Sequence, residues 1–94
     1  MDPFRPAPAP RHDATALLLG AMAWICADDD RANRLLAVTG LEGAELRARA
    51  TDSEVLVATG QFLADHEPDL IACARALDCT PLDIVDAVRR LGGE

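Results

Sequence analysis

The hydrophobic pattern of this chain is strongest in one stretch near its start. Residues 14–27 (ATALLLGAMAWICA) contain one polar side chain, that of Thr15. A surface helix carries a polar face, so this stretch predicts a helix that is covered on most sides. It is shorter than the ~20 apolar residues that cross a bilayer. We therefore expect it to be the central helix of a small core and not a membrane span.

One face of this predicted helix carries only small residues. At about 100° per residue, Ala16, Gly20, Ala23 and Ala27 form a narrow stripe beside the bulky side chains. Such a stripe permits close approach of another helix, but alanines on a helix also commonly face water. The sequence leaves both alternatives open.

Shorter segments with helical spacing follow the first. They are predicted at 31–39, at 43–50, from residue 51 or 52 to about 65, from Pro68 onward, and from Pro81 to the Gly92-Gly93 pair. Tyrosine is absent and β-branched residues form no run, so strands are not predicted. The pattern predicts an all-α fold, a compact bundle of five to six short helices around the central apolar N-terminal helix.

Polar residues at the predicted helix ends indicate caps. The Asp13 carboxylate is expected to accept hydrogen bonds at the start of the first helix, and Thr51-x-x-Glu54 and Thr80-Pro81-Leu82-Asp83 have the capping-box form. Asp28-Asp29-Asp30 lacks the alternating spacing of a calcium loop, so we interpret it as the start of a helix. Gly40 suits the left-handed position that ends one.

Apolar positions that recur with helical spacing predict the core. We also expect Val38 to face it, and Gly60 in mid-helix indicates close packing or a tolerated weakness. The core is predicted to include Leu17, Trp24, Ile25, Leu35, Leu46, Phe62, Leu70, Ile84 and Val88.

The two halves of the chain resemble each other weakly. A shift of 38 residues places Trp24-Ile25 over Phe62-Leu63 and the segment 40–46 over 78–84. Identities are few, so the match either marks a two-fold repeat of helix triplets or only reflects helix ends and turns at similar positions in the two halves.

The first dozen residues differ from the rest. Residues 1–12 contain four of the six prolines, which predicts a disordered tail, and residues 13–94 are expected to form a single helical domain. The spacing Pro3-x-x-Pro6 also fits a minimal polyproline ligand, although it arises easily by chance in such a segment. The start has no apolar signal-peptide region, so we expect a cytoplasmic protein.

Composition narrows the range of partners. The formal net charge is −7, from sixteen acidic residues against nine arginines, which disfavours nucleic acid and anionic membrane as partners. Cys26, Cys73 and Cys79 are odd in number, which fits reduced thiols and leaves an intermolecular disulfide as the weaker alternative.

No catalytic, cofactor or metal site is predicted. His66 lies between Asp65 and Glu67, but no nucleophile motif or glycine-rich phosphate loop accompanies it. The spacing of Cys73 and Cys79 is not one that binds zinc. We therefore expect a protein that is not an enzyme and has no cofactor.

A helix-turn-helix is the alternative function. The second and third predicted helices, and the fifth and sixth, join through short turns, and Asp78 holds the turn position usually taken by glycine. The last helix would present Leu82, Asp83 and Asp86 to DNA, and carboxylates repel phosphates. A degenerate nucleic-acid-binding regulator is therefore the weaker hypothesis.

Four arginines form the candidate interaction patch. Arg31, Arg34, Arg47 and Arg49 lie on the second and third predicted helices, where they could meet an acidic protein partner or nucleic acid, although a solvated surface is the more common role of such a cluster. A thin core around an apolar helix could also gain from a second copy, so a homodimer is possible in principle. The preferred function is a non-enzymatic protein-interaction or regulatory module whose partner the sequence does not name.

Several short motifs resemble a known family. The region 14–91 is similar to small all-helical alphaproteobacterial proteins grouped as domain of unknown function 3572, which usually have proline where this chain has Ser53. The resemblance implies a helical fold and a bacterial cytoplasmic setting, and brings no established activity, cofactor or catalytic residue. The matching motifs are Trp24-Ile25, Thr39-Gly40-Leu41, Leu46-Arg47-Ala48-Arg49-Ala50, Asp52 and Phe62-Leu63-Ala64-Asp65.

Overall fold

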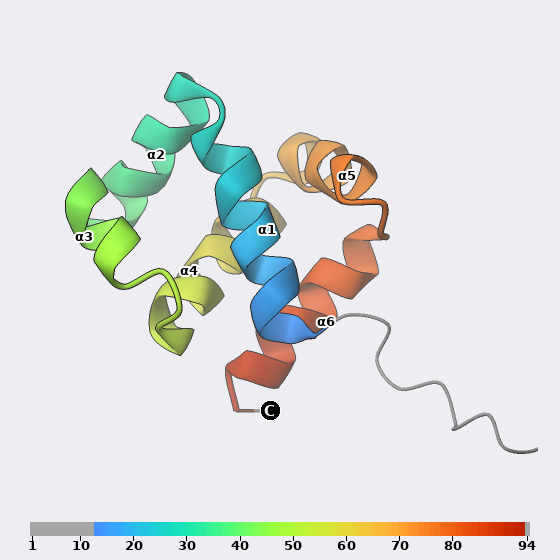
Figure 1. Cartoon of the computed structure of the whole chain (residues 1–94). Helices are drawn as coiled ribbons and strands as arrows, with labels where there is room; N and C mark the ends of the chain where they lie inside the picture. The colour runs from blue at the N-terminus through green and yellow to red at the C-terminus, as the bar shows by residue number, and fades with distance from the viewer. Residues whose placement is uncertain (1–12, 94) are drawn as a thin grey trace, which may run out of the picture.

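The structure is a computed structural model that describes residues 13–93, and the predicted tail at residues 1–12 lies outside this range. Within residues 13–93 the regular elements are six helices and no strand, which confirms the predicted all-α fold (Figure 1). The helices are α1 (Ala14–Cys26), α2 (Asp29–Thr39), α3 (Gly43–Ala48), α4 (Ser53–Ala64), α5 (Glu67–Ala76) and α6 (Pro81–Leu91).

Helices α1, α4 and α6 pack against one another and enclose the core. Helix α1 also contacts α2 and α5, which lie on either side of it in Figure 1, so it is central as predicted. Leu18, Ile25, Leu56, Leu63 and Ile84 are fully buried. Full burial of a Leu or Ile side chain stabilises a fold by about 1.5–3 kcal/mol, so this three-helix contact is the main source of stability.

The buried residues differ from the predicted core at three positions. Trp24 and Val88 pack against the core but are only partly buried, and Val38 is 69% exposed. Trp24 lies in the last turn of α1, and Val38 lies at the end of α2, which contacts only α1 and α4 closely, so neither is enclosed. The predicted core residues that are buried are Leu17, Ile25, Leu35, Leu46, Phe62, Leu70 and Ile84.

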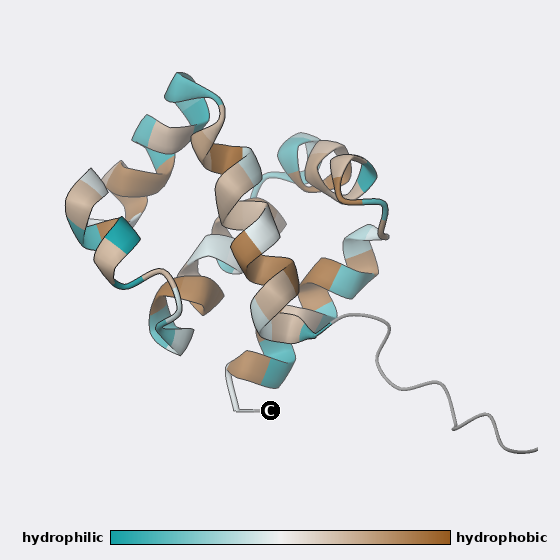
Figure 2. Ribbon diagram, viewed as in Figure 1, coloured by the Kyte–Doolittle hydropathy of each residue, from teal (hydrophilic) through white to brown (hydrophobic). Residues whose placement is uncertain are grey.

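Most of the small-residue stripe on α1 faces away from the other helices. Ala16, Ala23 and Ala27 are exposed, and only Gly20 lies near another helix segment, with Leu77 beyond the end of α5 facing it. Figure 2 shows that α1 is apolar along most of its length. Because alanine exposes little apolar area, a helix with almost no polar side chain tolerates this open side.

Gly60 marks the closest approach between α4 and α6. It is buried, and a Cβ added there would overlap Cγ2 of Val88 and come within 3.0 Å of Cδ2 of Leu18. The absence of a side chain therefore lets α4 approach α6 and α1. Of the two sequence interpretations of Gly60, close packing is correct.

Several predicted helix ends are confirmed. The Asp28 carboxylate accepts a hydrogen bond from the Arg31 backbone N–H at 3.0 Å, so the acidic triplet opens a helix. Gly40 ends α2 in the left-handed conformation with φ of 74°. Thr80 and Asp83 form the predicted capping box of α6, with distances of 3.1 and 2.9 Å.

Other predicted ends are wrong in detail. Asp13 precedes α1, but its side chain makes no capping bond. Of the two candidate caps of α4, Thr51 and Asp52, it is Asp52 that caps the helix by accepting from the Glu54 backbone N–H, so the capping box expected at Thr51-x-x-Glu54 is wrong. Helix α2 begins at residue 29 because Asp28 is already its cap, α3 ends at residue 48, and α5 begins one residue before Pro68. These shifts of one or two residues leave the order of the helices unchanged.

The helix starts recur at the spacing noticed in the sequence. Asp29 and Glu67 begin α2 and α5, Gly43 and Pro81 begin α3 and α6, and each pair lies 38 residues apart. The third helices are not equivalent in packing, because α3 has six residues and α6 has eleven and lies in the core. The 38-residue repeat therefore concerns the positions at which helices start and not the way they pack.

Candidate functional site

Arg31 is engaged with the end of α1. Its guanidinium carbon lies 3.7 Å from the centroid of the Trp24 ring, and its Nη2 donates to the Trp24 carbonyl oxygen at 3.4 Å. Stacking of this kind is a cation–π contact, and it joins α2 to the end of α1. The Arg31 backbone N–H also lowers the pKa of the Asp28 carboxyl below its ordinary value, because this hydrogen bond favours the ionised form.

Arg34 links α2 to α5. Its Nη2 lies 3.3 Å from Oδ2 of Asp69, and His66 Nε2 lies 3.6 Å from the same oxygen. Arg34 also lies over the Phe62 ring, at 6.0 Å from its centroid. The Asp69 side chain is only 16% exposed, so these contacts hold two helices together.

The other two predicted patch residues lie on or just after α3. Arg49 binds Asp52 through Nε and Nη2 at 3.2 and 3.1 Å. Arg47 is exposed and makes no ion pair with residues 13–93. Three of the four arginines in the predicted patch thus already have partners in this part of the chain.

The arrangement of α5 and α6 does not suit a DNA-binding helix-turn-helix. Asp78 does hold the turn, with φ of 57°, a left-handed conformation that glycine adopts more easily. However, α6 packs against both α1 and α4 and buries Ile84 and Ala87, so it is a core helix. The other candidate, α3, has six residues. A recognition helix lies in the major groove, and the accessible positions on α6 include Leu82, Asp83 and Asp86, whose carboxylates would repel the phosphates.

The chemistry-bearing residues are dispersed. His66 is exposed and pairs with Asp69, and in residues 13–93 no three His, Cys, Asp or Glu side chains are grouped as a metal site. Burial raises the pKa of the Cys73 thiol to about 11. Burial, together with the charges of Asp83 and Asp78, raises the pKa of the Cys79 thiol. Both thiols are therefore protonated near neutral pH, and neither is an activated nucleophile.

All three cysteines are free thiols, and only Cys26 is exposed. Over residues 13–93, none of the helices combines the length and apolar character needed to cross a membrane.

Among residues 13–93, three large apolar side chains are exposed, and two of them border open hollows. Val38 is 69% exposed, Leu82 is 68% and Ile71 is 42%. The first hollow, of about 310 Å³, is lined by Val38, Thr39, Leu41, Arg49, Glu54, Val55 and Ala58. The second, of about 330 Å³, is lined by Ile71, Ala74, Arg75, Asp78, Cys79 and Pro81.

The sequence reasoning missed two of these apolar positions. Ile71 falls outside the face formed by Leu70, Cys73 and Ala74, and that offset is the signal that could have found it. Val38 has the spacing of a core residue, three positions after Leu35, and only the place of α2 in the fold exposes it. Leu82 was already expected to be presented on the last helix.

The turn between α5 and α6 shapes the second hollow. The Asp78 backbone N–H donates to the Arg75 carbonyl at 3.2 Å, and the Cys79 N–H donates to the Ala74 carbonyl at 2.9 Å. This pair of bonds around a left-handed residue is the Schellman motif. It turns the chain sharply, so that Pro81 and Ile71 line the same hollow.

The chain belongs to the family described as protein of unknown function, DUF3572, whose model matches residues 11–94. No curated protein and no solved structure matches it. The family description names no activity.

Proposed function

We propose that this member of the DUF3572 family is a non-enzymatic protein-interaction module of the bacterial cytoplasm. The observation that carries the proposal is the exposure of Val38, Ile71 and Leu82. Single exposed apolar residues are ordinary, but Val38 and Ile71 each border an open hollow. A partner's side chains can fill such a hollow and pack against the apolar side chain that projects beside it.

The polar residues support a binding role over a catalytic one. His66 and Arg34 share the carboxylate of Asp69, and Arg31 is stacked on Trp24. The two arginines join helices to one another, and His66 pairs within the start of α5, so these groups are not arranged around a space where a substrate could react. An interaction through apolar surfaces needs no such arrangement.

Site-specific photo-crosslinking in living cells tests this proposal. A photoreactive amino acid is placed at Val38, Ile71 or Leu82, and at two exposed control positions, Asn33 and Ala76. Each control lies five residues from its partner position, about 140° around the same helix. We expect adducts with protein at one or more of the three apolar positions and none at the controls.

Adducts with equal yield at all five positions, or at none of them, would contradict the proposal. Circular dichroism of each purified variant checks that the fold is kept.

A further inference from the structure

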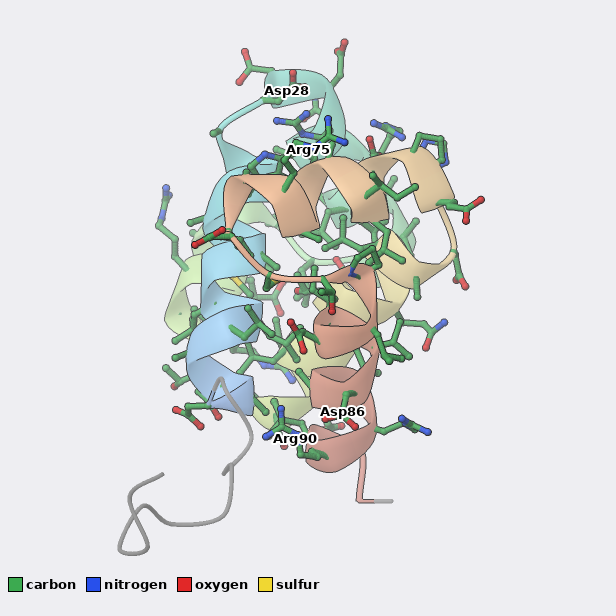
Figure 3. All side chains as sticks on the ribbon, turned by 90° about the vertical axis from the view of Figure 1, so that its right-hand side faces the viewer. Asp28, Arg75, Asp86 and Arg90 are labelled. Carbon is green, nitrogen blue, oxygen red and sulfur yellow. The ribbon has the colours of Figure 1, made fainter. Side chains whose placement is uncertain are left out.

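The surface around the α5–α6 turn has the properties of a self-association site. We call it the α5–α6 patch, and define it by Ile71, Arg75, Asp78, Pro81 and Leu82. Its apolar part is Ile71 beside the hollow of about 330 Å³, together with Leu82, which follows Pro81 in the first turn of α6. Figure 3 looks onto this side of the molecule, with α5 across the front and Arg75 labelled on it.

Two charges of opposite sign line the same hollow. Arg75 and Asp78 are both exposed, and neither makes an ion pair with any residue in 13–93. By contrast, Arg89 and Arg90 on α6 each lie within reach of Asp86, at 3.4 and 3.1 Å. The patch therefore presents an unpaired cation and an unpaired anion beside an apolar projection.

We infer that the occupant of this patch is a second copy of the chain, related by a two-fold axis. A two-fold axis brings one patch against its own copy, so a surface with both charge signs can complement itself. Arg75 then faces the partner's Asp78, and the reverse pair forms by symmetry. Ile71 and Leu82 meet their counterparts and fill the two hollows.

The expected dimer is weak. Five side chains bury less than the ~800 Å² per partner of standard stable interfaces, so we expect a dissociation constant in the micromolar to millimolar range. The net charge of −7 on each copy opposes association. At physiological salt, however, charges further apart than about 8 Å are largely screened, so the local pairs decide the orientation.

This inference rests on the proposed binding function and names its partner, and charge reversal tests it. Arg75→Glu and Asp78→Lys are prepared separately. Arg47→Glu is the control for Arg75→Glu, because Arg47 is also exposed and without an ion pair in residues 13–93, and both substitutions lower the net charge by the same amount. Sedimentation equilibrium over a range of concentrations gives the dissociation constants. We expect each patch variant alone to dissociate about tenfold more readily than the wild type, and Arg47→Glu to match the wild type.

The decisive measurement is an equimolar mixture of the two patch variants. In the mixed dimer one pair is Glu with Lys and the other is the native Arg75 with Asp78, so association should return to the wild-type level. The backbone of Asp78 has a left-handed conformation, which asparagine tolerates better than most residues. Asp78→Asn therefore serves as a second variant, and it should also weaken the dimer.

Three results would overturn the inference: a wild type that stays monomeric up to millimolar concentration, equal effects of Arg75→Glu and Arg47→Glu, or no recovery in the mixture. A monomeric wild type that still gives photo-adducts with a different protein would overturn the dimer and leave the proposed function standing.

Discussion

Gly60 offers the sharpest test of how this fold is held together. A glycine in a helix interior is about 1 kcal/mol less favourable than alanine, so Gly60→Ala should stabilise α4 if space allows. The new methyl would overlap Cγ2 of Val88 and press on Cδ2 of Leu18. Val88 is β-branched and has little rotamer freedom to withdraw, and overpacking of this kind costs about 1–3 kcal/mol. We expect a net loss of about 1–2 kcal/mol.

The same contact predicts a specific rescue. Val88→Ala alone removes two methyl groups and should cost about 1–2 kcal/mol. In the double variant the methyl group introduced at position 60 occupies the space that the Val88 methyl leaves. The two substitutions should therefore be non-additive, with a coupling of at least about 1 kcal/mol in favour of the double variant.

Urea denaturation followed by circular dichroism and by the fluorescence of Trp24, the one tryptophan of the chain, measures all four proteins. Gly20→Ala is the matched control, because a Cβ there makes an ordinary 3.4 Å contact with Leu77. It should gain about 0.5–1 kcal/mol. If Gly60→Ala is as stable as the wild type, or if the two effects add within about 0.5 kcal/mol, the close approach of α4 to α6 is refuted.

Four further predictions concern single residues. Thr80→Ala should cost about 1 kcal/mol of stability by removing the cap of α6, and an unchanged urea midpoint would count against that role. Asp78→Gly should gain about 1 kcal/mol at low micromolar concentration, because glycine adopts the left-handed turn without strain; a loss would contradict the assigned conformation. A thiol reagent at neutral pH, followed by mass spectrometry, should modify Cys26 long before Cys73. Burial raises the pKa of the Cys73 thiol to about 11, so the folded chain keeps this proton to a higher pH than the unfolded chain does. The stability that this difference reflects is fully present below pH ~9. It is lost as the pH rises from about 9 to about 11, because the thiol of the unfolded chain ionises first.

The local signals in the sequence were sufficient for the helices and their order. Thr80 with Asp83, Asp28 and Gly40 act within one turn of the chain, so their capping roles depend on neighbours that the sequence shows directly. The apolar stretch of α1 likewise required burial wherever the other helices lay, and it is the central helix.

Which side chains are exposed, covered or paired depends on contacts between residues that are far apart in the sequence. Val38 has the spacing of a core residue but is exposed, Trp24 stacks against Arg31 of α2, and Gly60 lies where a side chain would overlap Val88 of α6. The sequence predicts Arg34 as part of an exposed basic patch, but the fold places the Asp69 carboxylate beside it. A side chain's spacing along its own helix does not say which other helix reaches it.

The sequence by itself determined an all-α fold of five to six helices, several of their ends and a central apolar helix, because helix periodicity and capping are properties of neighbouring residues. The tertiary structure alone decided which apolar side chains stayed outside and which charges were left unpaired. It brought Ile71, Arg75 and Pro81 to one hollow, because the left-handed turn at Asp78 folds α6 back toward α5. Packing between segments determines which side chains lie on the surface, and the residues of the proposed site come together only through that packing.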